Sequence, residues 1–116
     1  MTNRVVITGM GGVSSIGMSV PEIYNSLREG RPGIGQLEFP DITRLKVKTG
    51  GQIKNFDPSK HFDLKQVGRT DRFSQLALLA AKEAITNSGL ENCNEEWREN
   101  AGVILGSSIG GIETIN

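Results

Sequence analysis

Two glycine-rich loops in this sequence are suited to holding an anion, because glycine lets backbone N–H groups approach a ligand closely. The first loop follows the apolar run 5–8 and contains Gly9, Gly11, Gly12 and Gly17. A dinucleotide fingerprint, Gly-x-Gly-x-x-Gly, would need its third glycine at position 14, which is Ser14. A P-loop would need a lysine after its last glycine, whereas Gly17 is followed by Met18. The spacing therefore favours a structural turn over a nucleotide site.

The second loop, 106–111, contains Gly106, Gly110 and Gly111 and precedes an expected helix start. Its Gly106-x-Ser108-x-Gly110 pattern matches the nucleophile elbow of serine hydrolases, and Ser107 is a second candidate nucleophile. A serine nucleophile needs a histidine base, and the one histidine is His61, in a stretch without clear periodicity. A serine hydrolase is therefore a weak hypothesis.

The single cysteine gives no reason to expect thiol or metal chemistry. Cys93 lies in Glu91-Asn-Cys-Asn-Glu-Glu96, and flanking acids oppose the formation of a thiolate. One histidine and one cysteine, far apart in the chain, make no metal-ligand cluster. No metal, no cofactor and no internal disulfide are expected.

The composition is that of one modest folded unit without a strong charge. Lysine and arginine total 13, aspartate and glutamate total 13, and the pI is 6.6. This balance argues against general affinity for nucleic acid or an anionic membrane surface. No apolar run is long enough to span a bilayer, and the N-terminus lacks a signal-peptide pattern, so a cytoplasmic location is expected.

Two apolar runs, 5–8 and 101–107, predict strands buried on both faces, because their apolar residues do not alternate with polar ones. Residues 47–53 predict a short strand weakened by Gly50 and Gly51, and 35–45 predict an irregular connection. Strands that alternate with helices indicate the α/β class, with a mostly parallel sheet.

Two helices have clear start and stop signals. The first begins after the capping pair Ser19 and Glu22, tolerates Pro21 in its first turn and ends at Gly30. Its predicted apolar stripe consists of Val20, Ile23, Tyr24 and Leu27. The second helix covers 71–88, is rich in alanine and ends at Gly89.

Three further stretches have weaker signals. Residues 61–68 predict a helical turn, and 91–100 predict a polar loop that contains Trp97. Residues 112–115 predict the first turn of another helix.

Taken in order, these motifs resemble the β-ketoacyl-acyl-carrier-protein synthases, most closely those of the synthase II type. The matching stretches cover nearly the whole chain. They are Arg4-Val-Val-Ile-Thr-Gly-Met-Gly11 with Val13-Ser14-x-x-Gly17, Gly30-Arg-x-Gly33-Ile34, Gly51-x-Ile-Lys-x-Phe56-Asp57, Asp71-Arg72-Phe73 with the helix to Gly89-Leu90, and Gly106-Ser-x-Ile109-Gly110-Gly111.

The resemblance implies a thiolase-like αβαβα fold, of which this chain has only the first part of the N-terminal half, and a homodimeric enzyme. It also implies a decarboxylative Claisen condensation in fatty-acid elongation, with acyl carrier protein as the partner that carries the acyl and malonyl groups. In this family a cysteine is the covalent nucleophile, supported by two histidines and an oxyanion hole.

The resemblance assigns few roles within the chain itself. Ile109 matches a position that lines the acyl-chain pocket, whereas Cys93 and His61 do not match the catalytic positions. Gly9, Gly11, Gly17, Gly106, Gly110 and Gly111 match structural glycine loops. The nucleophilic cysteine and both histidines are expected beyond residue 116, so residues 1–116 are interpreted as an incomplete N-terminal segment that is inactive alone.

Two other interpretations stay open at this point. The chain could be a non-catalytic protein that keeps the first part of the fold and binds a partner subunit. It could also be the segment of a polyketide-type ketosynthase, since these motifs do not separate that enzyme from the fatty-acid one.

Overall fold

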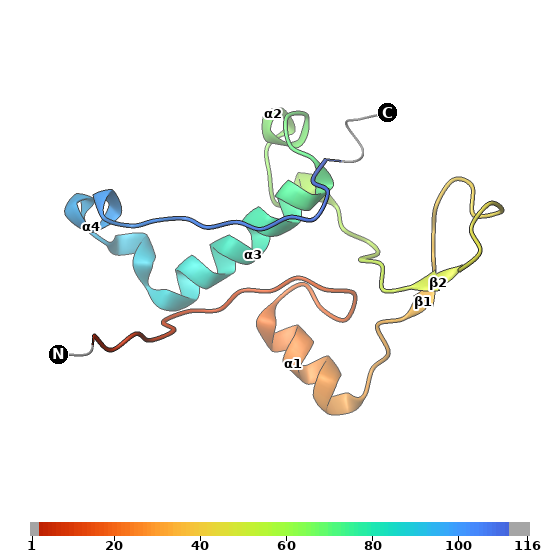
Figure 1. Ribbon diagram of the computed structural model, residues 1–116, viewed down its shortest axis with the longest axis horizontal. Helices are drawn as coiled ribbons and strands as arrows, with labels where there is room; N and C mark the ends of the chain where they lie inside the picture. The colour runs from red at the N-terminus through yellow and green to blue at the C-terminus, as the bar shows by residue number, and fades with distance from the viewer. Residues whose placement is uncertain (1–2, 112–116) are drawn as a thin grey trace.

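The computed structural model describes residues 3–111, and its longest element is a helix that lies near the centre of the ribbon (Figure 1). In chain order the elements are α1 (Val20–Glu29), β1 (Gly35–Gln36), β2 (Thr49–Gly50), the 3-10 turn η1 (Pro58–Lys60), α2 (Leu64–Val67), α3 (Arg72–Ser88), the 3-10 turn η2 (Leu90–Asn92) and α4 (Glu95–Glu99). The predicted first turn at 112–115 lies outside the described residues.

Helix α1 begins and ends where its capping residues predict. The Ser19 hydroxyl accepts a hydrogen bond from the Glu22 backbone N–H at 3.4 Å, and the Glu22 carboxylate accepts one from the Met18 N–H at 2.8 Å. Gly30 ends the helix in the left-handed conformation, with φ 68°, as glycine at this position usually does.

The predicted apolar stripe of α1 is only partly covered by other residues. Tyr24 and Leu27 are 63% and 67% exposed. The residue that α1 buries is Ser26, whose hydroxyl donates to the Ile16 carbonyl oxygen at 2.7 Å. Ser26 therefore joins α1 to the loop that precedes it through a hydrogen bond.

Helix α3 confirms the predicted alanine-rich helix, and Gly89 ends it with φ 74°. Near its start Gln75 is 5% exposed. The Gln75 side-chain amide donates to the Thr70 carbonyl oxygen at 2.8 Å, which satisfies a buried polar group.

The prediction of two buried strands is wrong for this structure. Residues 5–8 and 101–107 are extended but unpaired, and Val5 and Ile104 are 91% and 100% exposed. Their β-branched composition favours extended backbone, but a strand also needs a neighbouring strand, and none pairs with them within residues 3–111. The sheet described here is an antiparallel hairpin, Gly35 with Gly50 and Gln36 with Thr49, in place of the predicted parallel sheet.

The weaker predictions have mixed outcomes. The short strand predicted within 47–53 is present as β2, whereas its partner β1 lies in a stretch predicted to be irregular. The helical turn predicted within 61–68 is α2, which Asp63 caps. The prediction of a polar loop at 91–100 is wrong, because η2 and α4 lie in this stretch. The Asn94 side chain accepts a hydrogen bond from the Trp97 N–H at 2.9 Å and so caps the start of α4.

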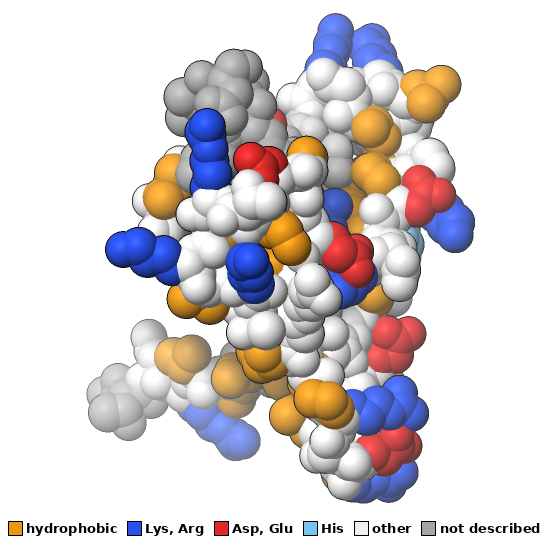
Figure 2. Space-filling view, turned by 90° about the vertical axis from the view of Figure 1, so that its right-hand side faces the viewer, with side chains coloured by type: hydrophobic (Ala, Val, Ile, Leu, Met, Phe, Trp, Pro, Cys, Tyr) orange, Lys and Arg blue, Asp and Glu red, His pale blue; other side chains and the backbone are white. Residues whose placement is uncertain are grey.

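The chain is open in shape and buries little apolar surface. Its radius of gyration is 17.4 Å, whereas a compact chain of this length would have about 13 Å. Among residues 3–111 Phe56 is the one apolar residue that is largely buried, with 9% of its surface exposed. Apolar side chains reach the surface between charged ones on the face in Figure 2. Within the same residues no helix has both the length and the apolar character needed to cross a membrane.

Candidate functional site

The first glycine-rich loop lies directly against helix α3. A Cβ atom added at Gly9 would overlap the Ala84 carbonyl oxygen, and one added at Gly11 would overlap the Ala80 carbonyl oxygen. Only glycine at these two positions lets the loop backbone approach the helix backbone this closely.

Polar side chains of α3 accept hydrogen bonds from the same loop. The Glu83 carboxylate accepts from the Gly12 N–H at 2.9 Å and from the Val20 N–H at 2.8 Å. The Asn87 side-chain oxygen accepts from the Met10 N–H at 3.3 Å. These N–H groups, which a nucleotide-binding loop would turn towards phosphate, are therefore bonded within the chain.

The end of the loop folds into a tight turn before α1. The Ser14 N–H donates to the Gly17 carbonyl oxygen at 2.8 Å, and the Gly17 N–H donates back at 3.3 Å. A Cβ atom at Gly17 would lie 2.6 Å from the Ile23 nitrogen, so the turn also packs closely on α1.

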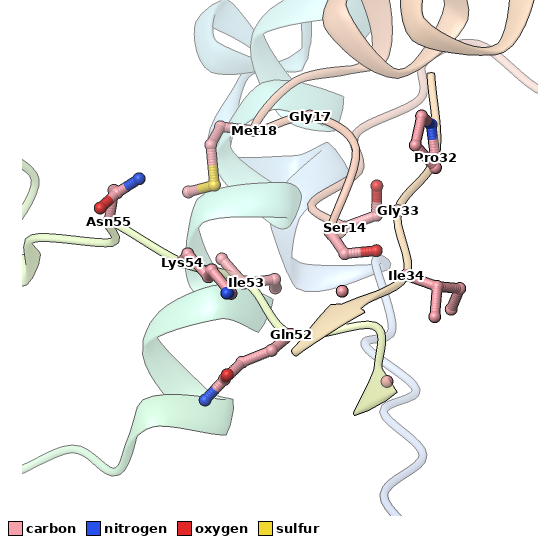
Figure 3. Close-up of a pocket in the computed structure, with 13 residues that line it drawn as sticks. Ser14, Gly17, Met18, Pro32, Gly33, Ile34, Gln52, Ile53, Lys54 and Asn55 are labelled. Atoms are coloured by element: carbon pink, nitrogen blue, oxygen red, sulfur yellow. The ribbon is translucent and has the colours of Figure 1, made fainter. Parts of the chain in front are cut away.

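A cleft of about 350 Å³ opens beside this turn (Figure 3). Three stretches border it, 14–18, 32–35 and 50–55, and they bring serine hydroxyls together with the polar side chains of Gln52, Lys54 and Asn55. Neither a cysteine nor a histidine lines this cleft, so it offers polar contacts to a ligand but no nucleophile paired with a histidine base.

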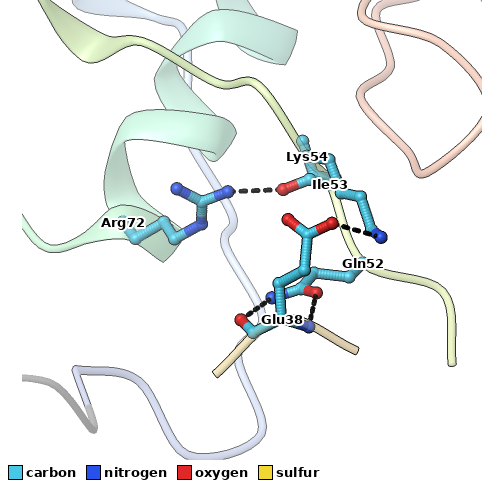
Figure 4. Close-up of polar contacts among 5 residues, drawn as sticks. All are labelled: Glu38, Gln52, Ile53, Lys54 and Arg72. Carbon is cyan, nitrogen blue, oxygen red and sulfur yellow. Dashed lines mark hydrogen bonds and ion pairs between the residues drawn. The ribbon is translucent and has the colours of Figure 1, made fainter. Parts of the chain in front are cut away.

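Side-chain contacts tie the hairpin to α3 (Figure 4). The Gln52 side chain accepts from the Glu38 N–H at 2.7 Å and donates to the Glu38 carbonyl oxygen at 3.0 Å. The Lys54 ammonium and the Glu38 carboxylate form an ion pair of 2.6 Å, and Arg72 donates to the Ile53 carbonyl oxygen at 2.6 Å. These contacts hold the hairpin and the segment after it in place, and they form no catalytic group.

The serine and histidine candidates are not brought together. The Ser107 hydroxyl accepts a hydrogen bond from the Gly110 N–H at 3.1 Å, which shapes the second glycine-rich loop. The His61 ring stacks on Phe56, with centroids 5.9 Å apart and planes at 14°. In the part of the chain that the structure describes, no hydrogen bond joins His61 to Ser107 or Ser108, so the serine-hydrolase hypothesis has no geometric support.

The remaining candidate groups have local roles. The half-buried Cys93 thiol donates to the Leu90 carbonyl oxygen at 2.8 Å, at the end of η2. The Ser59 hydroxyl and then the Ser59 N–H lower the pKa of Asp57, which caps η1. Within residues 3–111 no three metal-ligating side chains gather into a possible metal site.

Comparison with known proteins decides the family. A family model described as β-ketoacyl synthase, N-terminal domain, matches residues 2–116, which is almost the entire chain. The chain belongs to the β-ketoacyl synthase family. Membership implies a thiolase-like fold, although the small α/β arrangement described above does not display that fold in full.

Curated β-ketoacyl synthases are similar to this chain over nearly its whole length. The 3-oxoacyl-(acyl-carrier-protein) synthase 2 of Staphylococcus aureus strain COL is 41% identical over 111 residues, which are 96% of this chain. The protein of the same name from a Synechocystis species is 36% identical over 112 residues, 97% of this chain. In both cases the chain spans only 27% of the relative's length.

The residue proposed to line the acyl pocket of this β-ketoacyl synthase segment lies in the second glycine-rich loop. Ile109 is 68% exposed and precedes Gly110, whose φ of 75° favours glycine. Gly110 lies beside Phe73 at the start of α3, because a Cβ atom there would be 3.8 Å from that ring. A Cβ atom at Gly106 would meet no neighbour within 4 Å, and Gly111 is half-buried. The pocket role of Ile109 and the structural roles of these glycines stay predictions.

Sequence reasoning missed the two α3 side chains that hold the first loop. Glu83 and Asn87 are one turn apart, and Glu83 lies next to Ala84 and three residues after Ala80. An acidic residue at the edge of an alanine-rich stripe was the available signal, since a carboxylate close to a buried face needs hydrogen-bond donors.

Proposed function

We propose that this chain is the N-terminal part of a 3-oxoacyl-acyl-carrier-protein synthase II-like condensing enzyme of fatty-acid elongation. The observation that carries the proposal is the match of the β-ketoacyl synthase N-terminal model to residues 2–116. Relatives named 3-oxoacyl-(acyl-carrier-protein) synthase 2, at 36% and 41% identity, support the type of synthase.

The proposed reaction is a decarboxylative Claisen condensation. An acyl group passes from acyl carrier protein to a cysteine thiol, and malonyl-acyl-carrier-protein loses CO₂. The resulting carbanion attacks the acyl thioester and releases the thiol. We assign neither Cys93 nor His61 to these steps, because the Cys93 thiol donates to the Leu90 carbonyl oxygen and His61 stacks on Phe56. The nucleophile and the two histidines belong to the part of the enzyme that follows residue 116, so residues 1–116 alone are inactive.

The proposal includes an incomplete αβαβα domain that requires the rest of the enzyme. Residues 5–8 and 101–107 are extended, apolar and unpaired, as expected of strands whose neighbours come from elsewhere in a larger sheet. We further propose a homodimeric, cytoplasmic enzyme with acyl carrier protein as its partner and with no cofactor, nucleic acid or membrane in its function.

The test is to express the complete gene product that contains residues 1–116 and to assay it with acyl- and malonyl-acyl-carrier-protein. We expect 3-oxoacyl-acyl-carrier-protein and CO₂ from that product, and neither from the isolated 116 residues. Condensation by the isolated residues would refute their inactivity. If the complete product condensed only polyketide-type intermediates, a polyketide-type ketosynthase would replace the fatty-acid assignment. If it had no condensing activity, the proposal would be refuted.

A second candidate function is favoured by the exposed apolar segments. A non-catalytic protein that keeps this part of the fold would use Val5, Ile7, Val103 and Ile104 to bind a partner subunit. This alternative requires a gene that encodes no downstream cysteine and histidine motifs. A soluble, monodisperse monomer of the 116 residues in sedimentation would argue against it.

A further inference from the structure

One carboxylate joins three parts of the chain that are far apart in sequence. Glu83 lies in the second half of α3, and its two oxygens accept from the Gly12 N–H at 2.9 Å and the Val20 N–H at 2.8 Å. Gly12 belongs to the first glycine-rich loop, and Val20 is the first residue of α1. Each oxygen therefore has its own backbone donor.

These donors make a favourable place for negative charge. The first N–H groups of a helix have no partner within the helix, and the helix dipole leaves partial positive charge at that end. Hydrogen bonds from backbone N–H groups to a carboxylate are shorter and stronger than those to a neutral acceptor. The loop and the α1 start thus bind the Glu83 carboxylate as a loop of this kind would bind an external anion.

The close packing of the loop brings the carboxylate within reach. Gly9 and Gly11 lie against the carbonyl oxygens of Ala84 and Ala80, so the loop crosses α3 at backbone contact. At that separation a glutamate side chain on the helix spans the distance to Gly12.

We propose that Glu83 is the positioning residue of the glycine-rich loop and acts as its built-in anion. Its carboxylate holds loop 9–17 and the start of α1 against α3 and occupies donors that would otherwise attract an external anion. This inference depends on the hydrogen bonds of Glu83 and not on the proposed condensing activity.

A cleft beside Glu83 gives a way to test the role of its charge. The cleft has a volume of about 410 Å³ and is bordered by Met18, Ser19, Leu79, Lys82, Glu83, Thr86 and Asn87. If Glu83 is shortened to alanine, a small carboxylate such as formate can enter from this cleft and meet the two freed N–H groups.

The experiment is hydrogen–deuterium exchange of the complete gene product, read by mass spectrometry in peptides that cover residues 9–20. We expect Glu83→Ala to accelerate exchange there about tenfold or more, because two charge-assisted hydrogen bonds are lost. Glu83→Gln should have a smaller effect, since an amide oxygen accepts one of the bonds. Lys82→Ala, on the exposed neighbour in α3, is the matched control and should leave these peptides unchanged.

Formate separates a charge role from a packing role. Added formate should restore protection in Glu83→Ala but not in Glu83→Met, whose side chain fills the space. The proposal would be overturned if residues 9–20 exchanged equally fast in Glu83→Ala and in Lys82→Ala. It would also be overturned if formate did not restore protection in Glu83→Ala. If Glu83→Ala does not fold, Glu83→Gln must protect residues 9–20 better than Glu83→Met, and equal protection would overturn the proposal.

Discussion

The Arg72 guanidinium carbon lies 5.3 Å from the centroid of the Phe56 ring. Arg72 also donates to the Ile53 carbonyl oxygen at 2.6 Å, and His61 stacks on the same phenyl ring. The buried Phe56 therefore contacts both an aromatic ring and a cation that is hydrogen-bonded to the main chain. This cluster joins the segment after the hairpin to the first turn of α3.

The first prediction concerns that cation. Arg72→Ala should lower the free energy of unfolding by about 2 kcal/mol, through loss of a charged hydrogen bond and a cation–π contact. Arg72→Lys should recover less than half of this loss, because lysine lacks the planar guanidinium. Urea denaturation measures both values, with Arg44→Ala, at an exposed position, as the control. Equal stability of the Arg72→Ala and Arg44→Ala variants would contradict the role of the cluster.

The second prediction concerns the closest approach of loop and helix. Gly11→Ala should destabilise the protein by about 1–3 kcal/mol, because its methyl group would overlap the Ala80 carbonyl oxygen and force the loop away from α3. Gly35→Ala is the matched control, since no atom lies within 4 Å of a Cβ added there. Thermal unfolding compares the two variants. A Gly11→Ala protein as stable as Gly35→Ala would show that the loop does not pack on α3 in this way.

The third prediction concerns the pH dependence of the turn at η1. The Ser59 hydroxyl, at 2.7 Å, and the Ser59 N–H, at 3.0 Å, hold the pKa of Asp57 below its ordinary value of 3.8. Because the pKa of Asp57 is lower in the folded state, its carboxylate stabilises the turn at every pH above the pKa of the unfolded state. This stabilisation is lost as the pH falls through the pKa of the folded state. The turn should therefore loosen only below pH 3.8. An NMR titration of the Asp57 carboxyl carbon measures the midpoint, and one at or above 3.8 would contradict the capping role.

Local signals predicted the helices well because their causes are local. Ser19 starts α1, Gly30 ends it and Gly89 ends α3, each through hydrogen bonds to residues within one turn. The strands could not be predicted in the same way. Residues 5–8 and 101–107 have a strand-like composition, but pairing depends on neighbours that residues 3–111 do not supply.

The candidate site was predictable only in part for a related reason. The spacing of the glycines argued against a nucleotide loop, but it did not identify which residues the loop contacts. The partner of the Gly12 N–H is Glu83, 71 residues later, and no periodicity along the chain predicts that pairing. The ordered motifs therefore indicated the family from sequence alone, whereas the hydrogen bonds of the loop depend on tertiary contacts that the sequence pattern does not reveal.

The fourth prediction concerns Ile109 and the acyl chain. The Ile109 side chain is 68% exposed in the second glycine-rich loop, beside the left-handed Gly110, so a larger side chain fits here without strain in the segment itself. We propose that Ile109 lines the acyl pocket of the complete enzyme, so Ile109→Trp should shorten the space available to the acyl chain. We expect kcat/KM for long acyl chains to fall about tenfold or more relative to short ones.

Ile109→Val is the control for that measurement, because it removes one methyl group and should leave long chains accepted. Purified enzyme with acyl-acyl-carrier-protein substrates of increasing length gives the ratio directly. A fall in activity that is equal for all lengths would indicate damage to the loop and not to the pocket. An unchanged preference in a folded, active Ile109→Trp enzyme would show that Ile109 does not line the pocket, because a much larger side chain in the channel would exclude part of the substrate.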